Sequence, residues 1–423
     1  LNQISVFAEN QLVRRYQLNY TTLNPALSTI SSIKDFGADN TTLWYNITFS
    51  YYQSEAGYVN GTTWTPPVIF SDSSHEDFGV RLLDVNNDGF MDIVKGRGST
   101  SEKKVWINNK MNNWTLDNSW QLPDYIVTGS GVDEGVRFAD VNEDGFVDWI
   151  YAKNGVRNVS VHNGTGWRVD SSWTFPVDVV DESGVDQGVL LEDVDGDGRI
   201  DIVKAKAGVS RSVYINTGKG WVDRSSSWSF PVDAISSAGA DRGVRLVDVN
   251  SDGLPDILLG GHEGGDAKNA WLNNGSGWVN STLWIPPVYF TTGTHADNGT
   301  RFVDVNGDGT TDIVEDFFNS SVSARGAWIN NGSGWISNTT WQAPEAFTSS
   351  GHNIGRRLAD VNGDGFVDLV VSHQDSTQQY TWRKNNTMPY LLSVIRNEYG
   401  GETTLNYTSS TRYNNTDEDG LSD

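Results

Sequence analysis

The sequence contains no cysteine. This absence excludes disulfides, zinc–thiolate sites, iron–sulfur clusters and cysteine nucleophiles. A secreted chain without disulfides needs another source of stability, and a bound metal ion is a common one.

Long hydrophobic runs and basic residues are also scarce. No run approaches the roughly 18 consecutive apolar residues of a membrane span, so we expect no membrane insertion. The 54 acidic residues outnumber the 30 Lys and Arg residues, which gives a formal net charge of -24. Such a chain repels nucleic acid and anionic lipid, and we expect neither as a partner. The chain starts at Leu1 without a signal peptide, so we interpret it as mature or excised from a longer one.

Aromatic residues and turn formers are plentiful. Trp, Tyr and Phe make up 11% of the chain, whereas helix formers such as Lys and Glu are few. This balance favours short strands around a large core and argues against disorder. Sixteen Asn-x-Ser/Thr sequons, among them Asn46, Asn163 and Asn280, exceed what composition alone gives. They predict N-linked glycans on a secreted, extracellular or cell-surface protein; a turn-rich composition is the alternative.

One motif occurs six times. It reads DVNNDGFMDIV from Asp84, and the other copies begin at Asp140, Asp193, Asp248, Asp304 and Asp360. Successive copies start 56, 53, 55, 56 and 56 residues apart. Each lies between a GVRLLDV-like run and a VWINN-like run, and in most units a Trp-x5-6-Trp segment follows, with one or two residues between its second Trp and a Pro. Four short strands in a unit of about 55 residues are typical of a β-propeller blade.

The phase of the repeat indicates how the ring closes. The sixth unit lacks its Trp-Pro segment, and Tyr58–Pro67 is such a segment with no unit before it. We therefore predict an all-β fold over residues 58–386, a six-bladed β-propeller whose last blade is completed by the N-terminal strand. A seven-bladed ring is the less favoured alternative.

The two ends of the chain differ from the repeat. Residues 1–57 and 387–423 contain strand-like runs, and both carry the tetrapeptide LNYT. We interpret 1–57 as a flanking β-strand segment and 387–423 as a C-terminal β-strand segment with an acidic tail. Both are expected to belong to β-structure against which the propeller docks.

The repeated motif has the chemistry of a calcium loop. Each copy reads D-x-[DN]-x-D-G-x-x-D, with side-chain oxygens at positions 1, 3, 5 and 9. Ca2+ takes about six to eight oxygen ligands, and the Gly at position 6 lets the carbonyl at position 7 point inward. The candidate ligands, with position 7 acting through its carbonyl, are Asp84, Asn86, Asp88, Phe90, Asp92, Asp140, Asn142, Asp144, Phe146, Asp148, Asp193, Asp195, Asp197, Arg199, Asp201, Asp248, Asn250, Asp252, Leu254, Asp256, Asp304, Asn306, Asp308, Thr310, Asp312, Asp360, Asn362, Asp364, Phe366 and Asp368.

We expect about six structural Ca2+ ions. Nineteen carboxylates crowd into the loops and would repel one another without cations. The third loop has four of them and is expected to bind most tightly. The alternative is a set of Asx-turns in which Asp and Asn cap their own backbone. In the tail, Asn415, Asp417, Asp419 and Asp423 repeat the spacing and form either a seventh site or an acidic linker.

A further oxygen recurs seven residues before each loop. The residues are Asp77, Asp133, Asp186, Asp241, Asp297 and Asn353. They either cap the turn that leads into the next strand or bind the cation of an adjacent loop, and we favour the turn.

The loops within their GVRF…DIV…WINNGSGW units resemble the FG-GAP/VCBS propeller repeats of integrin α-chains and many microbial surface proteins. The flanks, LSTISSIKDFGADNTTLWYNITFSYY and LLSVIRNEYGGETTLNYTSSTRYNN, are similar to those of Rhs/YD-repeat and insecticidal toxin-complex B-component proteins. The resemblance implies structural calcium and propeller faces that contact proteins or glycans.

Three functions follow from these observations. The first is an extracellular, calcium-stabilised structural or adhesive module of a larger cell-surface or filament protein, with a protein, a glycan or a second copy as partner. The second is a glycan-binding, lectin-like propeller, although the repeated Trp residues are better explained as core. The third is the propeller of a Rhs/toxin-complex-like shell. We expect no enzyme, because the six His residues show no paired spacing and no nucleophile–base constellation stands out.

Overall fold

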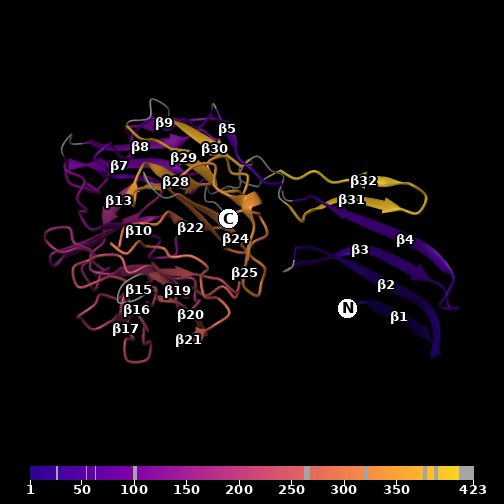
Figure 1. The fold of residues 1–423 in the computed structure, drawn as a ribbon. Helices are drawn as coiled ribbons and strands as arrows, with labels where there is room; N and C mark the ends of the chain where they lie inside the picture. The colour runs from indigo at the N-terminus through magenta and orange to yellow at the C-terminus, as the bar shows by residue number, and fades with distance from the viewer. Residues whose placement is uncertain are drawn as a thin grey trace.

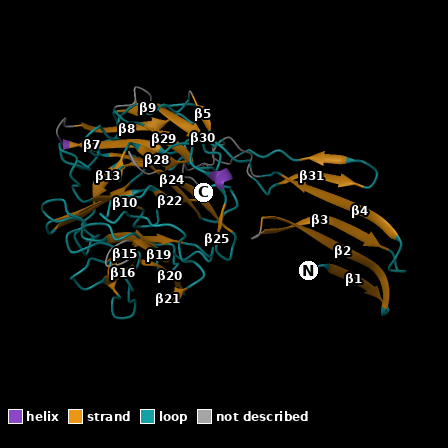
Figure 2. Cartoon of the chain, viewed as in Figure 1, coloured by secondary structure: helices purple, strands orange, loops and turns teal. Residues whose placement is uncertain are grey.

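The computed structural model describes the whole chain except residues 25–26, 54, 62, 99–101, 262–266, 319–322, 375–378, 385–388 and 409–423. The described residues form strands and turns, with helix limited to short 3-10 segments such as η2 at Thr339–Trp341 (Figure 2). The prediction of an all-β fold is confirmed. No described helix is long and apolar enough to cross a bilayer.

Each copy of the motif lies in its own antiparallel sheet, which we number 1 to 6 in chain order. The strands, from first to last in each sheet, are β6 (Val80–Leu83), β7 (Asp92–Arg97), β8 (Glu102–Asn108) and β9 (Trp114–Asp117); β10 (Val136–Ala139), β11 (Asp148–Lys153), β12 (Val156–His162) and β13 (Trp167–Val169); β14 (Val189–Glu192), β15 (Asp201–Lys204), β16 (Ser212–Asn216) and β17 (Trp221–Asp223); β18 (Val244–Val247), β19 (Asp256–Gly261), β20 (Ala267–Asn273) and β21 (Trp278–Ser281); β22 (Thr300–Val303), β23 (Asp312–Phe318), β24 (Ser323–Asn330) and β25 (Trp335–Ser337); β28 (Arg356–Ala359), β29 (Asp368–Val371), β30 (Tyr380–Arg383) and β5 (Val59–Gly61).

Sheet 6 is completed from the other end of the chain, as the repeat phase predicted. β5 pairs antiparallel with β30, and Trp382 lies opposite Asn60. Sheet 5 also carries two short strands, β26 (Thr348–Ser349) and β27 (His352–Asn353). In Figure 1 the last strands β9, β17, β21 and β25 lie at the edge of this body, and the first strands β10 and β22 lie near its middle.

The second strand of each sheet is buried on both faces. In β7, for example, the neighbouring residues Ile93 and Val94 are both fully buried. Neighbouring sheets cover both faces, so these strands are continuous apolar runs and not the alternation of a half-exposed strand. The repeated DIV in the sequence reflects this double burial.

Neighbouring sheets are joined by short parallel contacts. Arg97 of sheet 1 bridges to Val127, Lys153 of sheet 2 to Val180, and Lys206 of sheet 3 to Ile235. The amide of Phe290 donates to the Gly260 carbonyl at 2.7 Å, and Phe317 pairs with Thr348. Ser71 bridges to His373, so the sixth sheet also contacts the segment that leads into the first.

The ends of the chain form one further sheet beside this body. Its six antiparallel strands are β1 (Gln3–Ala8), β2 (Gln11–Asn24), β3 (Leu27–Phe36), β4 (Leu43–Tyr51), β31 (Leu392–Asn397) and β32 (Glu402–Thr404). β4 pairs with β31, so strands from both termini lie side by side (Figure 1). We call this the flanking sheet.

Candidate metal centre

The acidic loops share one hydrogen-bonded turn. In the first loop Asp84 accepts the amides of Asp88 and Gly89 at 3.1 and 2.7 Å. Asp88 in turn accepts the amide of Phe90 at 3.0 Å. The same bonds from positions 1 and 5 recur in all six loops. The carboxylates therefore shape their own loop, as the Asx-turn alternative requires.

The turn uses the left-handed backbone region at two positions. Asn87 at position 4 has a φ of 56°, and Gly89 at position 6 has a φ of 83°. Glycine adopts this conformation without strain, which explains why position 6 is Gly in every copy.

Position 3 distinguishes the third loop from the others. In loop 1 the Asn86 amide donates to Asp88 at 3.1 Å, and the same bond is found in loops 2, 4 and 5. Loop 3 has Asp195 there, and the carboxylate oxygens of Asp193, Asp195 and Asp197 lie within 4.8 Å of one another. Oδ1 of Asp195 is buried and has no hydrogen-bond partner among the described residues. Three converging carboxylates with one unpaired buried oxygen fit a hard divalent cation, which takes oxygen ligands.

Basic side chains stand beside two of the loops. Arg199 contacts Asp197 and donates to Glu143 of the neighbouring loop at 3.0 Å. Lys110 lies 3.4 Å from Asp88. These cations offset part of the local acid charge while leaving Asp195 free of an ion pair.

The carboxylate at position 9 is placed differently from the other three side-chain positions. All six are fully buried, namely Asp92, Asp148, Asp201, Asp256, Asp312 and Asp368. In loop 1 the two Asp92 oxygens accept the amides of Val85 and Asn108 at 3.1 and 2.7 Å. Asp201 is not part of the group formed by the other acids of loop 3. Position 9 therefore connects the loop to the third strand of its sheet.

Burial strongly favours the neutral form of these carboxyls. Desolvation raises the pKa of Asp92 and Asp312 to about 8, although backbone donors oppose the shift. The pKa of Asp148 and Asp201 rises to about 7 for the same reason. The pKa of Asp256 rises to about 6.

The oxygen seven residues before each loop caps a turn. Asp77 accepts the amide of Gly79 at 2.8 Å, and the equivalent bond occurs in all six repeats. In four repeats the same acid also pairs with an Arg four residues later. The turn interpretation is confirmed.

The sequence reasoning missed a side chain that connects neighbouring sheets. The third strand ends in Asn108, Asn216, Asn273 or Asn330 in four sheets, and each amide donates at 2.8–2.9 Å to the position 2 Val carbonyl of the preceding loop. Asn108 of sheet 1 reaches Val361 of sheet 6. His162 and Lys384 occupy this place in sheets 2 and 6. The repeated INN of the sequence was the signal for this contact.

The repeated Trp residues are core. Trp120, Trp173, Trp228 and Trp284 are buried. Trp173 packs edge-on against Trp221 of the next sheet with ring centroids 5.2 Å apart. The other Trp of four pairs, such as Trp221, is half-buried, so the Trp pairs contribute to the packing between sheets.

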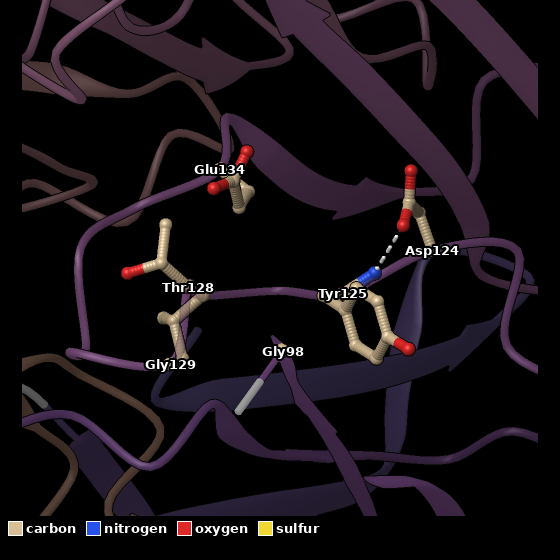
Figure 3. A pocket seen from close by; sticks show the side chains of 7 residues that line it. Gly98, Asp124, Tyr125, Thr128, Gly129 and Glu134 are labelled. Atoms are coloured by element: carbon tan, nitrogen blue, oxygen red, sulfur yellow. Dashed lines mark hydrogen bonds between the residues drawn. The ribbon is translucent and has the colours of Figure 1, made fainter. Parts of the chain in front are cut away.

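An open cavity of about 430 Å³ lies between sheets 1 and 2 (Figure 3). Asp124, Tyr125, Thr128 and Glu134 line it together with Gly98, Val127 and Gly129. Its charged groups already have partners: Glu134 accepts from Lys153 at 3.0 Å, and Asp124 lies 3.9 Å from the Lys103 ammonium. The residues Asn415, Asp417, Asp419 and Asp423 of the suggested seventh loop lie outside the described residues.

Two family models match parts of the chain. The FG-GAP-like repeat model matches residues 193–259 and 248–315. The model of the insecticide toxin TcdB middle/N-terminal region matches residues 332–423. The chain combines FG-GAP-like repeats with a TcdB-type region. The resemblance inferred from the loops and the flanks is confirmed.

Solved toxin-complex structures share the fold of these FG-GAP-like repeats and of the flanking sheet. A Photorhabdus luminescens Tc holotoxin pore structure matches 92% of this chain with a TM-score of 0.60 and 19% identity. TcdB2-TccC3 without its hypervariable C-terminal region matches 96% with a TM-score of 0.55 and 17% identity. The chain spans 18% and 19% of those two structures.

A curated relative matches over a shorter stretch. The T-cell immunomodulatory protein homolog of Plasmodium yoelii yoelii is 31% identical over 136 residues, which is 30% of this chain and 19% of the relative. The match therefore covers about a fifth of the length of this curated relative.

Proposed function

We propose that this chain is a non-catalytic structural module: a calcium-stabilised, six-bladed propeller built into a larger secreted shell of the toxin-complex kind. The observation that carries the proposal is the flanking sheet, in which strands from both ends of the chain pair outside the repeats. A propeller inserted between neighbouring strands of a shell needs this arrangement. The likeness to toxin-complex structures covers the repeats and the flanks together, which supports the same assignment.

Contacts between consecutive sheets support six blades in a closed ring. Ser71 bridges to His373, and Asn108 donates to Val361, so the last sheet meets the first. Closure hides the sheet edges that an open array would expose.

The loop chemistry supports calcium. In loop 3 Asp193, Asp195 and Asp197 would hold the ion, and an ion there would satisfy the unpaired oxygen of Asp195. The position 1, 3 and 5 residues of the other loops would act in the same way. Bound Ca2+ supplies charge neutralisation and fixes the loops, and it takes no part in a reaction. The absence of catalysis is consistent with perturbed carboxyls that recur in every sheet, since catalysis needs one asymmetric site.

The test is a thermal melt of the purified chain in calcium and in excess chelator. A cation at a hundredfold excess over its Kd stabilises by about 2.7 kcal/mol per site, so chelation is expected to lower the Tm by about 10 °C or more. Asp195→Asn should reduce the calcium-dependent part of the shift, and Asp124→Asn, outside the loops, should leave it intact. An unchanged melt would show that the loops are Asx-turn networks only, and it would end the calcium part of the proposal.

A glycan array tests the lectin alternative independently of calcium. One candidate site for a sugar is the cavity around Tyr125. Binding that Tyr125→Ala abolishes without a change in Tm would favour the lectin over the structural module.

A further inference from the structure

The first strands of the six sheets carry a ring of matched charges. Arg81, Arg137, Arg245 and Arg301 each pair with the turn-capping Asp four residues earlier at 2.7–3.0 Å. Two of these pairs are bidentate: Arg245 and Arg301 each give separate hydrogen bonds from Nη1 and Nη2 to the two oxygens of their Asp. In these four sheets the repeat supplies one guanidinium and one carboxylate.

In sheets 3 and 6 one member of this Arg–Asp pair is missing. In sheet 6 the acid is replaced by Asn353, and Arg357 donates from Nη1 to its Oδ1 at 3.1 Å and to the Arg356 carbonyl at 2.9 Å. Among the described residues, no acidic side chain pairs with Arg357. In sheet 3 the Arg is replaced by Leu190, so Asp186 caps its turn at Gly188 without an Arg from its own strand. Sheets 3 and 6 are three apart in the ring.

The six strands bring these charges close to one another. Arg357 is affected by the charges of Arg81 and Arg301 from the sheets on either side. Burial together with these two cations lowers the pKa of Arg357 to about 10, although Asp77 opposes the shift. The paired Arg side chains remain about one third exposed, for example 32% for Arg245. Water therefore reaches these side chains.

We propose that Arg357, between Arg81 and Arg301, is a binding site for a carboxylate supplied from outside this ring. In Arg245 and Arg301, Nη2 of the guanidinium already donates to a carboxylate oxygen of the Asp four residues earlier. Arg357 has the same guanidinium group, but it pairs with no acidic side chain among the described residues. A planar carboxylate can accept two parallel hydrogen bonds from such a guanidinium. Arg81 and Arg301 on either side are already paired with the equivalent Asp of their own sheets, so they do not compete with Arg357 for an added carboxylate. This inference rests on the convergence of the first strands and is independent of calcium.

The decisive variant is Asn353→Asp, which gives Arg357 the acid present in the other five repeats. It is expected to fold, because Asn353 already accepts the Gly355 amide at 2.9 Å as Asp77 accepts that of Gly79 at 2.8 Å. The probe is sodium acetate against sodium chloride at equal ionic strength, with calcium held constant. In the unmodified chain, acetate is expected to raise the Tm by about 1–2 °C over chloride.

In Asn353→Asp the acetate shift should vanish, and the Tm without acetate should rise. Leu190→Arg is the matched control, since it adds an ion pair for Asp186 on the opposite sheet and should keep the full acetate shift. An equal acetate shift in Asn353→Asp, or no shift in the unmodified chain, would overturn the proposal. A calcium-dependent melt without an acetate effect would reject this site and leave the proposed function standing.

Discussion

The six repeat sheets and the flanking sheet are built from similar strands but are stabilised differently. The second strand of each repeat sheet is buried on both faces. In the flanking sheet Phe7 is 62% exposed and Trp44 is 49% exposed. A single layer of strands satisfies its backbone hydrogen bonds, but it buries apolar surface only when another layer covers it. The repeats cover one another, whereas the flanking sheet leaves apolar side chains exposed in the part of the chain that the structure describes.

The largest expected effect compares one aromatic residue from each region. Phe290 is 1% exposed and packs edge-on against Phe302 with ring centroids 5.1 Å apart. Phe290→Ala is expected to cost about 3–5 kcal/mol of unfolding free energy, because it leaves a cavity. Trp44→Ala in the flanking sheet should cost less than about 1 kcal/mol. Denaturant melts measure both, and equal losses would mean that the two regions are packed alike.

The next effect concerns the Asn side chains that connect neighbouring sheets. Asn330 is fully buried and bonds to the carbonyls of Val249 and Thr311 and to the Gly332 amide. Asn330→Ala should lower stability by about 2–3 kcal/mol, since it leaves these buried groups unpaired.

Asn46 in the flanking sheet is the matched control. Its Oδ1 is buried without a hydrogen-bond partner, so Asn46→Ala should change the free energy of unfolding by less than about 0.5 kcal/mol. If Asn330→Ala were equally mild, the Asn contacts between sheets would be incidental to the ring.

The smallest of the three effects depends on pH. Glu315 in β23 accepts the Asn298 amide at 2.8 Å, and burial raises its pKa to about 7, with Lys268 opposing the shift. A raised folded-state pKa means that the contribution of this group to stability is complete below about pH 4.5 and is lost as the pH rises to about 7. Glu315→Gln removes the ionisation but keeps an acceptor. It should match the unmodified chain at pH 4.5 and exceed it by about 2 kcal/mol at pH 8.

Melts at the two pH values measure this difference. In the flanking sheet Asp35 faces Arg14 at 3.2 Å, so Asp35→Asn should show no gain at pH 8. A pH-independent effect of Glu315→Gln would mean that Glu315 ionises freely in the folded chain.

The sequence was sufficient for the strands, the strand that closes sheet 6 and the shape of the loops. These features repeat in every unit. Gly89, for example, recurs because position 6 of each loop needs a positive φ. The two roles within the loop were harder to separate. Asp88 and Asp92 look alike in a motif, yet Asp92 contacts the backbone of a strand 16 residues later. Only the fold shows which acid faces the loop interior and which faces the sheet.

The flanking sheet and the lack of an acidic partner for Arg357 among the described residues are features that the sequence alone could not predict. The pairing of β4 with β31 joins residues more than 300 positions apart, and no local pattern encodes it. Leu190 and Asn353 were visible as departures from the repeat. Their effect on charge pairing depends on which side chains of the neighbouring first strands lie near them, and the sequence does not show this.

The pairing of β5 with β30 has a consequence for how the chain is made. Val59 lies opposite Arg383, so the strand that completes sheet 6 is synthesised 324 residues before its partner. At about 5–20 residues per second, β5 waits roughly 15–65 s on the ribosome before sheet 6 can form. During that time the two edges at the seam are open to other strands. A nascent chain of this protein therefore has most need of a chaperone just before its last repeat emerges.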